Sequence, residues 1–407
     1  MHRSIYVLLS CFYATVFTVN AQSVPETRVR VSGFIQHSIY ADTYESSDTR
    51  DGVIMLYPKQ ASYDTNNQNI HQNLQFQMLA IQSRPRVTMD GPEIAGAKSS
   101  GMIEIDFLGT SQDYVQMIRL RHAYVKLQWT RIELLIGQYW HPMFSTSSFP
   151  ATILHGAGAP FHPLNRSPQI RLGWFPTKTL KLQLSLHSDG YHKSSGPPDA
   201  ARNAGIPEIQ GNLEYKTDEF ILGSTGGYKV LQPRIETSEG LKTQESVGSY
   251  NLKIYSRLNL GVFSLKAEGI LGENLSNYVM IGGYGAAEDP ELTDDYSYAN
   301  LITYSLWTDI SCRMKSLGAG VFIAYSGNLG SNTDYFPLEG YARGGDIAYM
   351  YRIAPRATLY LDKLSFSFEY LLTAAAYGNE LNNRGKPVMI QEPVQNHRFL
   401  FATRYSF

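Results

Sequence analysis

The 407-residue sequence predicts an all-β protein: a transmembrane antiparallel up-and-down β-barrel of about sixteen strands. Three observations predict this fold. Apolar and polar residues alternate along many short segments, the connections between those segments are alternately short and long, and the last strand is rich in aromatic residues. Alternation with a period of two places successive side chains on opposite faces of a strand, so one face can contact lipid while the other contacts water.

The alternation is clearest in two segments. From Lys363 to Tyr370, the even positions hold Leu, Phe, Phe and Tyr, whereas the odd positions hold Lys, Ser, Ser and Glu. From Gln169 to Trp174, Gln, Arg and Gly alternate with Ile, Leu and Trp. A soluble β-sandwich also has one buried and one solvated face, so alternation alone does not separate the two folds.

The connections between the expected strands make that distinction. The expected strands are 28–43, 73–90, 100–109, 115–128, 131–140, 167–176, 179–189, 207–216, 219–231, 246–258, 261–273, 297–313, 317–327, 341–354, 357–375 and 394–407. Links after even-numbered strands are mostly tight, as at Pro176-Thr177-Lys178, Thr217-Asp218, Asn259-Leu260 and Pro355-Arg356, with Gly91–Lys98 as the exception. Links after odd-numbered strands are mostly long and polar: 44–72, 141–166, 190–206, 232–245, 274–296, 328–340 and 376–393, with 110–114 as the short one. Short periplasmic turns and long external loops are typical of outer-membrane barrels.

The two ends of the chain agree with export to an outer membrane. Residues 1–21 read as a signal peptide, with a basic start, an apolar run and a small-residue cleavage site after Ala21, which leaves 22–407 as the barrel. The final segment places aromatic residues at alternate positions and ends in Tyr405-Ser406-Phe407. A terminal Phe on such a strand resembles the signal that the barrel assembly machinery reads, so Tyr405 and Phe407 are the expected assembly residues.

Composition excludes several other classes of protein. The formal net charge of −1 gives no sign of nucleic-acid binding, and the two cysteines suggest neither a zinc nor a redox site. We find no Gly-x-Ser-x-Gly elbow and no His–Asp grouping for a nucleophile, so an enzyme is not expected. The sequence likewise implies no cofactor.

Charged residues on the expected wet faces are the candidate functional residues. Sixteen strands enclose an aqueous lumen, whereas an Arg or Lys on the lipid face costs about 2–4 kcal/mol at the bilayer midplane. The residues expected to line the pore are therefore Arg119, Arg121, Arg171, Lys253, Arg257, Glu133 and Glu369. The simpler interpretation is that these charges only keep the pore wet.

Alternation fails in one strand. At the start of this strand the odd positions, Arg119 and Arg121, are polar. Later the odd positions are Ala123 and Val125, and the polar face is formed by the even positions His122, Tyr124 and Lys126. A β-bulge near Arg121–His122 would reconcile the two halves, because one extra residue shifts the side-chain phase.

The connection 141–166 is too apolar to lie in solvent, since it contains Met143, Phe144, Phe149, Ile153, Leu154, Phe161 and Leu164. We expect it to fold into the lumen and form a constriction that carries His141, His155, His162 and Arg166. Three histidines also raise the possibility of a metal site, but their spacing matches no compact ligand motif, so no metal is expected.

One stretch resembles a known family. The residues from Arg119 to Leu127 (Arg-Leu-Arg-His-Ala-Tyr-Val-Lys-Leu), followed by Leu-Ile-Gly-Gln-Tyr-Trp at 135–140 and Pro142, are similar to a Leu-Arg-x-Ala-Tyr-Val … Gly-Gln-x-Trp-x-Pro stretch of bacterial porins, with DcaP-like trimeric porins the nearest. The segment from Gly101 to Gly109 suits that family's third strand. The resemblance implies homotrimers and passive uptake of small, often anionic solutes.

The sequence thus predicts an outer-membrane porin that forms a water-filled channel for passive diffusion of small hydrophilic solutes, with anions among them. Its expected partners are outer-membrane lipid and lipopolysaccharide, the barrel assembly machinery, two further copies of the chain and the solutes themselves. The alternative is a non-channel outer-membrane barrel that acts as an adhesin or as a component of a surface assembly.

Overall fold

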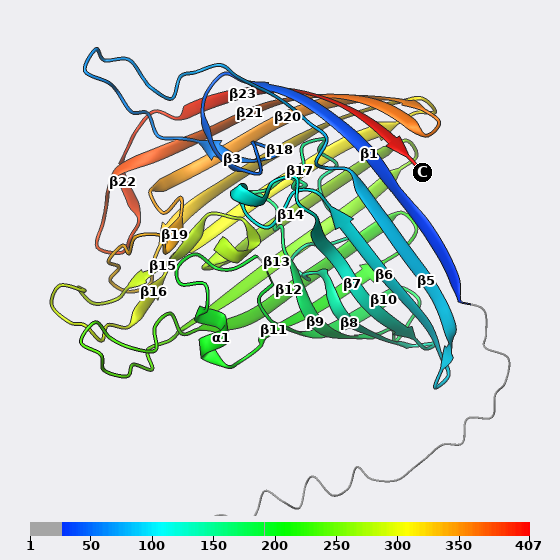
Figure 1. The fold of residues 1–407 in the computed structure, drawn as a ribbon, viewed down its shortest axis with the longest axis horizontal. Helices are drawn as coiled ribbons and strands as arrows, with labels where there is room; N and C mark the ends of the chain where they lie inside the picture. The colour runs from blue at the N-terminus through cyan, green and yellow to red at the C-terminus, as the bar shows by residue number, and fades with distance from the viewer. Residues whose placement is uncertain (1–26, 191) are drawn as a thin grey trace, which may run out of the picture.

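The structure, a computed structural model, describes residues 27–190 and 192–407, so the predicted signal peptide lies outside the described residues. Its wall is a closed antiparallel β-barrel of sixteen strands (Figure 1). In hydrogen-bonded order the wall strands are β1 (Arg28–Asp42), β4 (Gln75–Leu79) with β5 (Arg84–Ile94), β6 (Ala97–Asp106), β7 (Arg119–Gln128), β8 (Ile132–Trp140), β9 (Arg166–Trp174), β10 (Leu180–His187), β11 (Glu208–Lys216), β12 (Phe220–Leu231), β13 (Val247–Leu260), β14 (Phe263–Glu273), β17 (Ile302–Arg313), β18 (Leu317–Gly330), β20 (Ile347–Leu361), β21 (Leu364–Leu381) and β23 (Val394–Ser406). The sequence prediction of an up-and-down barrel is confirmed.

The first and last strands close the barrel. β1 pairs with β23 from Phe34↔Ser406 to Asp42↔Arg398, and its other edge pairs with β4 and β5. The terminal Phe407 exchanges two backbone hydrogen bonds of 3.1 Å with Gly33. Closure leaves no unpaired edge among the described wall strands; in hydrocarbon, each unsatisfied backbone group would cost several kcal/mol.

The two ends of the barrel differ. One end, here called the turn end, carries the tight turns and the C-terminus; the other, the loop end, carries the long connections (Figure 1). Elements outside the wall are β2 (Ser46–Thr49), β3 (Ile54–Pro58), β15 (Gly282–Ala286), β16 (Tyr298–Asn300), β19 (Ala342–Arg343), β22 (Pro387–Ile390), the α-helix α1 (Ala200–Ala204) and two 3₁₀ helices, Gln112–Tyr114 and Leu275–Tyr278. β15, β16 and β19 form a small sheet at the loop end. No helix among the described residues is long and apolar enough to cross a membrane.

The wall strands have one apolar and one polar face, as the alternation predicts. On β13, Leu252 and Ile254 are exposed on the outside, whereas Lys253 between them is fully buried on the inside. Tyrosines gather on the outer face toward the loop end, where Tyr325 lies 5.8 Å from the stacked ring of Tyr349. Amphipathic aromatic side chains at this level are typical of membrane–water interfaces.

Two tight turns lie elsewhere than predicted. The sequence suggested a longer link at Gly91–Lys98, but β5 and β6 continue to a two-residue turn at Ala95–Gly96, whose φ angles of 49° and 75° are those of a type I′ hairpin. Pro92 lies where the pairing register shifts between Asp90 and Glu93, so the hairpin accommodates it in an irregularity.

The predicted turn at Pro355-Arg356 is wrong. β20 runs through these residues, and the turn comes at Asp362–Lys363. Pro355 still pairs with Val321 of β18, while the ladder to β21 passes directly from Ile353 to Arg356. The strand therefore loses pairing to one neighbour at the residue that has no backbone N–H.

Three other predicted strands have different bounds. The segment 73–90 is broken at 80–83 into β4 and β5; the segment 297–313 divides into β16, outside the wall, and β17; and the strand predicted at 341 joins the wall only at Ile347. At each of these places the backbone bonds to another connection, as at Ile81 with Phe107, Leu301 with Gly283 and Tyr341 with Tyr284, and alternation cannot reveal such contacts.

Candidate functional site

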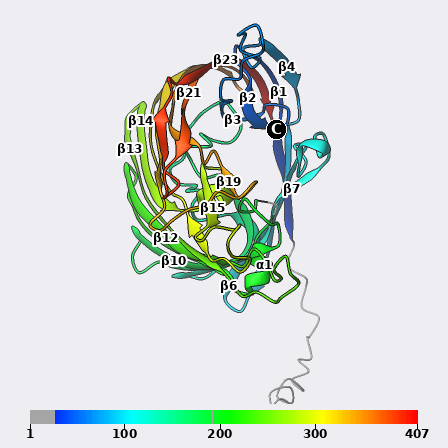
Figure 2. The ribbon, with the colours of Figure 1, turned by 90° about the vertical axis from the view of Figure 1, so that its left-hand side faces the viewer.

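The connection 141–165, between β8 and β9, lies inside the barrel. Ser148 donates a hydrogen bond of 2.8 Å to the carbonyl of Ser256 on β13, and the carbonyl of Phe161 accepts one of 2.7 Å from Ser305 on β17. The segment thus contacts the inner faces of strands on the far side of the wall from its own. Figure 2, turned by 90° from Figure 1, shows connecting chain within the ring of strands. We call residues 141–165 the inner segment.

Its apolar residues form a core inside the lumen. Phe144, Leu154, Phe161 and Leu164 are buried against inward-facing wall residues such as Phe322. This packing removes from water the apolar surface that made an external loop implausible.

A second connection also packs inside the barrel, and sequence reasoning missed it. Residues 53–57, most of which belong to β3, are buried and join the same core as the inner segment. The available signal was a run of five apolar residues, Val-Ile-Met-Leu-Tyr, inside an otherwise polar connection. A third connection contributes Leu275, Tyr278 and Met280, which pack on Met143 and Ile270.

Charged wall residues hold these connections through backbone groups. Glu369 of β21 accepts hydrogen bonds from the backbone N–H groups of Ile153 (3.1 Å) and Leu154 (2.8 Å). Lys253 of β13 donates to the carbonyls of Pro142 (3.2 Å) and Met143. The structure therefore places these two predicted pore-lining residues against the inner segment, where both are fully buried.

Arg352 of β20 joins two of the connections, and the sequence did not single it out. Its guanidinium donates to the carbonyl of Ala159 (2.8 Å) in the inner segment and to that of Leu56 (2.9 Å) in β3. It also donates to the carbonyl of Met55 (3.1 Å), and a hydrogen bond of 2.8 Å reaches Thr373 on the neighbouring strand β21. One buried cation thus ties the wall to both connections.

Arg119 and Arg121 belong to a buried ion-pair network. Arg119 makes a bidentate contact with Asp106 (2.9 and 2.6 Å), and Arg121 bridges Glu104 (2.7 Å) and Asp106 (2.8 Å). Both carboxylates come from the adjacent strand β6. This geometry explains how four charges lie together in the wall at little cost, because each is paired and hydrogen-bonded.

The β-bulge predicted near Arg121–His122 is confirmed. β6 and β7 pair through Glu104↔His122 and then Ile105↔Leu120, so Arg121 is the extra residue. As a result, the neighbours Arg121 and His122 are both buried. On the outer side, Gln138 donates hydrogen bonds to the carbonyls of Leu120 (3.0 Å) and Arg121 (3.1 Å), which satisfies the disturbed ladder.

The remaining predicted pore-lining residues are Arg171, Glu133 and Arg257. Arg171 and Glu133 line one cavity, and Arg171 also donates a hydrogen bond of 2.6 Å to the carbonyl of Trp140. Arg257 is half-buried on β13 and is not among the described residues that line this cavity.

The residues predicted for the constriction do not gather at one point. His141 lies 3.2 Å from Glu208, and His162 lies 2.8 Å from Glu268. His155 lies in a different cavity with Arg121, and burial together with Arg121 and Arg84 lowers the pKa of His155 well below its ordinary value. The guanidinium of Arg166 lies 4.6 Å from the ring of Trp140. In the described part of the chain, no three His, Cys, Asp or Glu side chains are arranged to hold a metal ion.

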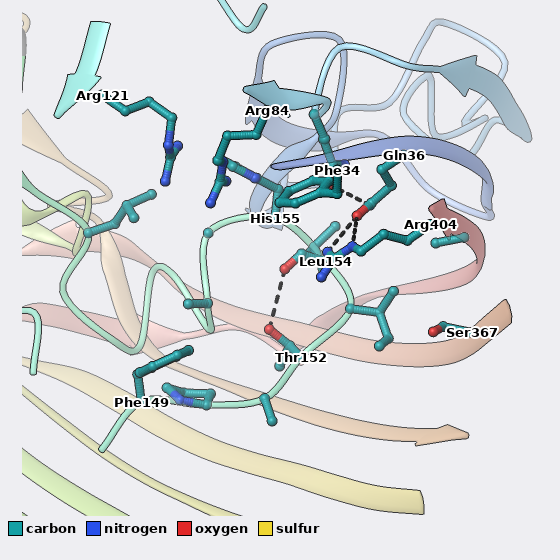
Figure 3. Close-up of a pocket in the computed structure, with 18 of the residues that line it drawn as sticks. Phe34, Gln36, Arg84, Arg121, Phe149, Thr152, Leu154, His155, Ser367 and Arg404 are labelled. Atoms are coloured by element: carbon teal, nitrogen blue, oxygen red, sulfur yellow. Dashed lines mark hydrogen bonds between the residues drawn. The ribbon is translucent and has the colours of Figure 1, made fainter. Parts of the chain in front are cut away.

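Two cavities flank the inner segment toward the turn end. The larger, about 480 Å³, is lined by five arginines and by no Asp or Glu among the described residues: Arg84, Arg86, Arg121, Arg166 and Arg404. Figure 3 shows Arg84, Arg121 and Arg404 around the segment that carries Leu154 and His155, with Arg404 hydrogen-bonded to Gln36 (2.8 Å). We call this cavity the basic chamber.

The smaller cavity, about 160 Å³, has both signs of charge: Lys126, Arg171 and Lys181 with Glu133 and Glu214. We call it the mixed chamber. Trp140, Phe144 and Thr146 line both chambers, so the start of the inner segment separates them. A solute within the turn-end half of the lumen would therefore meet one of two chemically different environments.

Comparison with known proteins identifies the fold. No protein-family model matches the chain, and no curated protein matches its sequence. Among solved structures, the outer membrane channel DcaP of Acinetobacter baumannii is similar with a TM-score of 0.71 at 13% identity, over 94% of this chain and 97% of that one.

Two further structures show the same architecture. OmpT of Vibrio cholerae in its trimer form has a TM-score of 0.54 at 8% identity, over 94% of this chain and 100% of that one. OmpF of Salmonella typhi, in complex with daunomycin, has a TM-score of 0.53 at 12% identity, over 93% of this chain and 97% of that one. The resemblance to porins that the sequence suggested is confirmed at the level of the fold.

Proposed function

We propose that the chain is an outer-membrane porin, a water-filled channel through which small hydrophilic solutes diffuse passively. The observation that carries the proposal is the pair of polar chambers beside an inner segment, inside a barrel whose outer face is apolar. The similarity to the DcaP channel and to OmpF supports it. The arrangement calls for no reaction chemistry, and we propose no enzymatic activity.

We further propose that the inner segment is the constriction of this channel. It spans the lumen between strands. Buried wall side chains contact its backbone at several points, and its own Ser148 hydroxyl donates to a wall carbonyl. A segment fixed in this way restricts the bore to a constant shape, whereas a free loop would fluctuate.

The basic chamber supports a preference for anions. Of its five arginines, Arg84, Arg86 and Arg121 contact Glu104, and Arg121 also contacts Asp106. Both carboxylates lie outside the chamber lining, while Arg404 contacts the neutral Gln36. Positive charge therefore exceeds negative charge at the chamber surface, and rings of one sign bias ion traffic.

Reconstitution in planar bilayers tests the proposal. We expect discrete conductance steps in KCl and a reversal potential on the anion side under a salt gradient. Arg404→Gln should lower the anion preference, while Lys363→Gln, the same charge change in the exposed turn outside the lumen, should leave it unchanged. Absence of conductance steps would refute the channel, and equal behaviour of the two variants would refute the role of the basic chamber.

The apolar core inside the lumen favours one alternative, a non-channel barrel that serves as an adhesin or as part of a surface assembly. Three connections contribute to it or pack beside it, so the loop end of the lumen is substantially filled. A barrel that folds and resists heat but conducts no ions would support this alternative.

For partners, we propose outer-membrane lipid and lipopolysaccharide around the apolar belt, the barrel assembly machinery during insertion, and two further copies of the chain. The trimer form of the similar Vibrio cholerae protein supports the last of these. Chemical cross-linking in intact cells should give a species of three times the chain mass; a single-chain species under all conditions would contradict it.

A further inference from the structure

The mixed chamber contains hydrogen-bond donors that the chain leaves unsatisfied. Gln183 Nε2 and Arg171 Nε are buried, and neither has an acceptor within reach among the described residues. A buried donor without a partner costs about 1–3 kcal/mol, so such groups normally contact water or a ligand. Both atoms belong to residues that line the same cavity, so a single small molecule with acceptor oxygens could satisfy them.

The same chamber offers acceptors with spare capacity. Glu133 lies 3.8 Å from Lys126 and 4.0 Å from Lys181, distances too long for hydrogen bonds. Glu214 accepts one hydrogen bond of 3.0 Å, from Tyr255. An ionised carboxylate has about four lone-pair positions, so both groups can accept further donors.

Aromatic rings supply part of the chamber surface. The rings of Tyr124 and Tyr139 meet edge to face with their centroids 4.9 Å apart. The ring of Tyr255 lies over Gly223, where a Cβ atom would be only 2.3 Å from the tyrosine Cζ. The lining is otherwise mostly polar, with Ser145, Thr146, Ser147 and Asn212 among its residues, so aromatic rings are its main apolar part.

The charge of the chamber excludes a strong preference for either sign. Its three cations face two carboxylates within one cavity, whereas the basic chamber beside it has five arginines and no Asp or Glu among the described residues of its lining. An anion would gain more in the basic chamber, and a cation would meet three cations against two carboxylates in the mixed chamber. The mixed chamber is therefore best suited to neutral molecules that both donate and accept hydrogen bonds.

From these observations we infer that the mixed chamber binds a small, neutral, polyhydroxylated solute of the sugar or polyol class. Hydroxyl oxygens accept from Gln183 and Arg171, hydroxyl hydrogens are donated to Glu133 and Glu214, and the C–H faces contact the tyrosine rings. This inference rests on the proposed channel function only for how the solute reaches the site.

Binding can be measured without conduction. Equilibrium dialysis of radiolabelled D-glucose and D-mannitol against the purified barrel in detergent should show saturable binding of at least one of the two. Gln183→Leu should weaken it about tenfold, the effect of losing about 1.4 kcal/mol. Gln82→Leu, the same change in the basic chamber, should leave it unchanged. Gln183→Met, which keeps the side-chain length and removes the amide, replaces Gln183→Leu should that variant fail to fold.

Bilayer recordings add an independent readout. D-glucose should reduce the KCl conductance of the wild-type channel in a saturable manner, and the half-effect concentration should rise about tenfold in Gln183→Leu. Saturable binding by a barrel that never conducts would uphold the site and refute the channel. Absence of binding of both probes, equal binding by Gln183→Leu and the wild type, or tighter binding of zwitterionic glycine than of either probe would overturn the inference.

Discussion

At the residue scale, the inner face of the barrel uses charge to hold backbone in place. Lys253, Glu369 and Arg352 each contact carbonyl or N–H groups of connections that fold into the lumen. Hydrogen bonds to charged groups contribute about 1.5–3 kcal/mol, roughly twice the neutral value. Full burial of these side chains therefore indicates fixed connections rather than a solvent-lined wall at this level.

Replacement of Glu369 tests this interpretation. Glu369→Leu removes the acceptor of two adjacent N–H groups, at a cost of about 1–3 kcal/mol for each group left unsatisfied. We expect the tip of the inner segment to detach, with faster protease cleavage within 141–165 and noisier single-channel currents. Glu369→Gln keeps one acceptor oxygen and should show a smaller change. If Glu369→Leu is cleaved no faster than the wild type, the carboxylate does not hold the segment.

At the element scale, alternation predicts where a strand lies, but it does not predict which wall strands a connection contacts. The wall strands and the bulge at Arg121 follow from side-chain periodicity, which is a local property of the chain. Arg352 and the inward course of β3 depend on contacts between segments roughly a hundred residues or more apart, and no local pattern encodes them. Pro355 misled the prediction because the strand tolerates the loss of pairing on one side.

For the candidate site, too, the sequence predicted which residues face inward but not what they contact. Periodicity placed Arg121, Arg171 and Glu133 on the inner face, and all three line chambers. Periodicity could not show that Lys253 and Glu369 contact the inner segment. Alternation distinguishes the inner face from the outer face, but it does not tell whether an inward side chain meets water or another part of the chain. For Gln183, alternation indicates only that the side chain faces inward. A single glutamine on a water-facing side of a strand is common, so nothing in the sequence indicated a binding residue.

The bulge in β7 depends on Gln138. Its side-chain amide donates to the carbonyls of both Leu120 and Arg121 on the neighbouring strand. Gln138→Leu should lower the free energy of unfolding by about 1–3 kcal/mol, because the donor is lost where lipid offers no replacement. Urea unfolding of the barrel refolded into lipid vesicles measures this change. Gln395→Leu, an exposed glutamine at the loop end of β23, is the control; equal destabilisation by both would contradict the assignment.

The closing strand should govern insertion more than stability. Phe407 contributes two backbone hydrogen bonds to Gly33 at the rim, and its side chain remains partly exposed. Deletion of Phe407 should reduce the amount of barrel in the outer membrane several-fold if the assembly machinery reads this residue, while barrel refolded in vitro keeps its β-sheet circular dichroism. Equal loss in cells and in vitro would indicate a purely structural role instead.

At the scale of the whole molecule, charge is arranged unevenly along the barrel axis. The turn-end half contains the basic chamber, whereas the connection at 288–295 at the loop end carries five acidic residues: Glu288, Asp289, Glu291, Asp294 and Asp295. An anion that entered from the loop end would pass this acidic connection, part of whose charge is paired with Arg234, before it reached the arginines. The barrel therefore presents different fields to solutes that arrive from its two sides.

Salt concentration separates this long-range field from direct contacts. The Debye length falls from about 10 Å at 0.1 M to about 3 Å at 1 M ionic strength, so charges at the rim and across the basic chamber are screened. We expect the anion preference, measured as the reversal potential across a fixed ratio of KCl concentrations, to fall as mean salt rises. The half-effect concentration of D-glucose should stay constant over the same range, because a neutral solute interacts through short hydrogen bonds that mobile ions do not screen. An anion preference that is independent of salt would show that contact-range arginines alone set it, and a glucose effect that falls in parallel would show that the two chambers do not act separately.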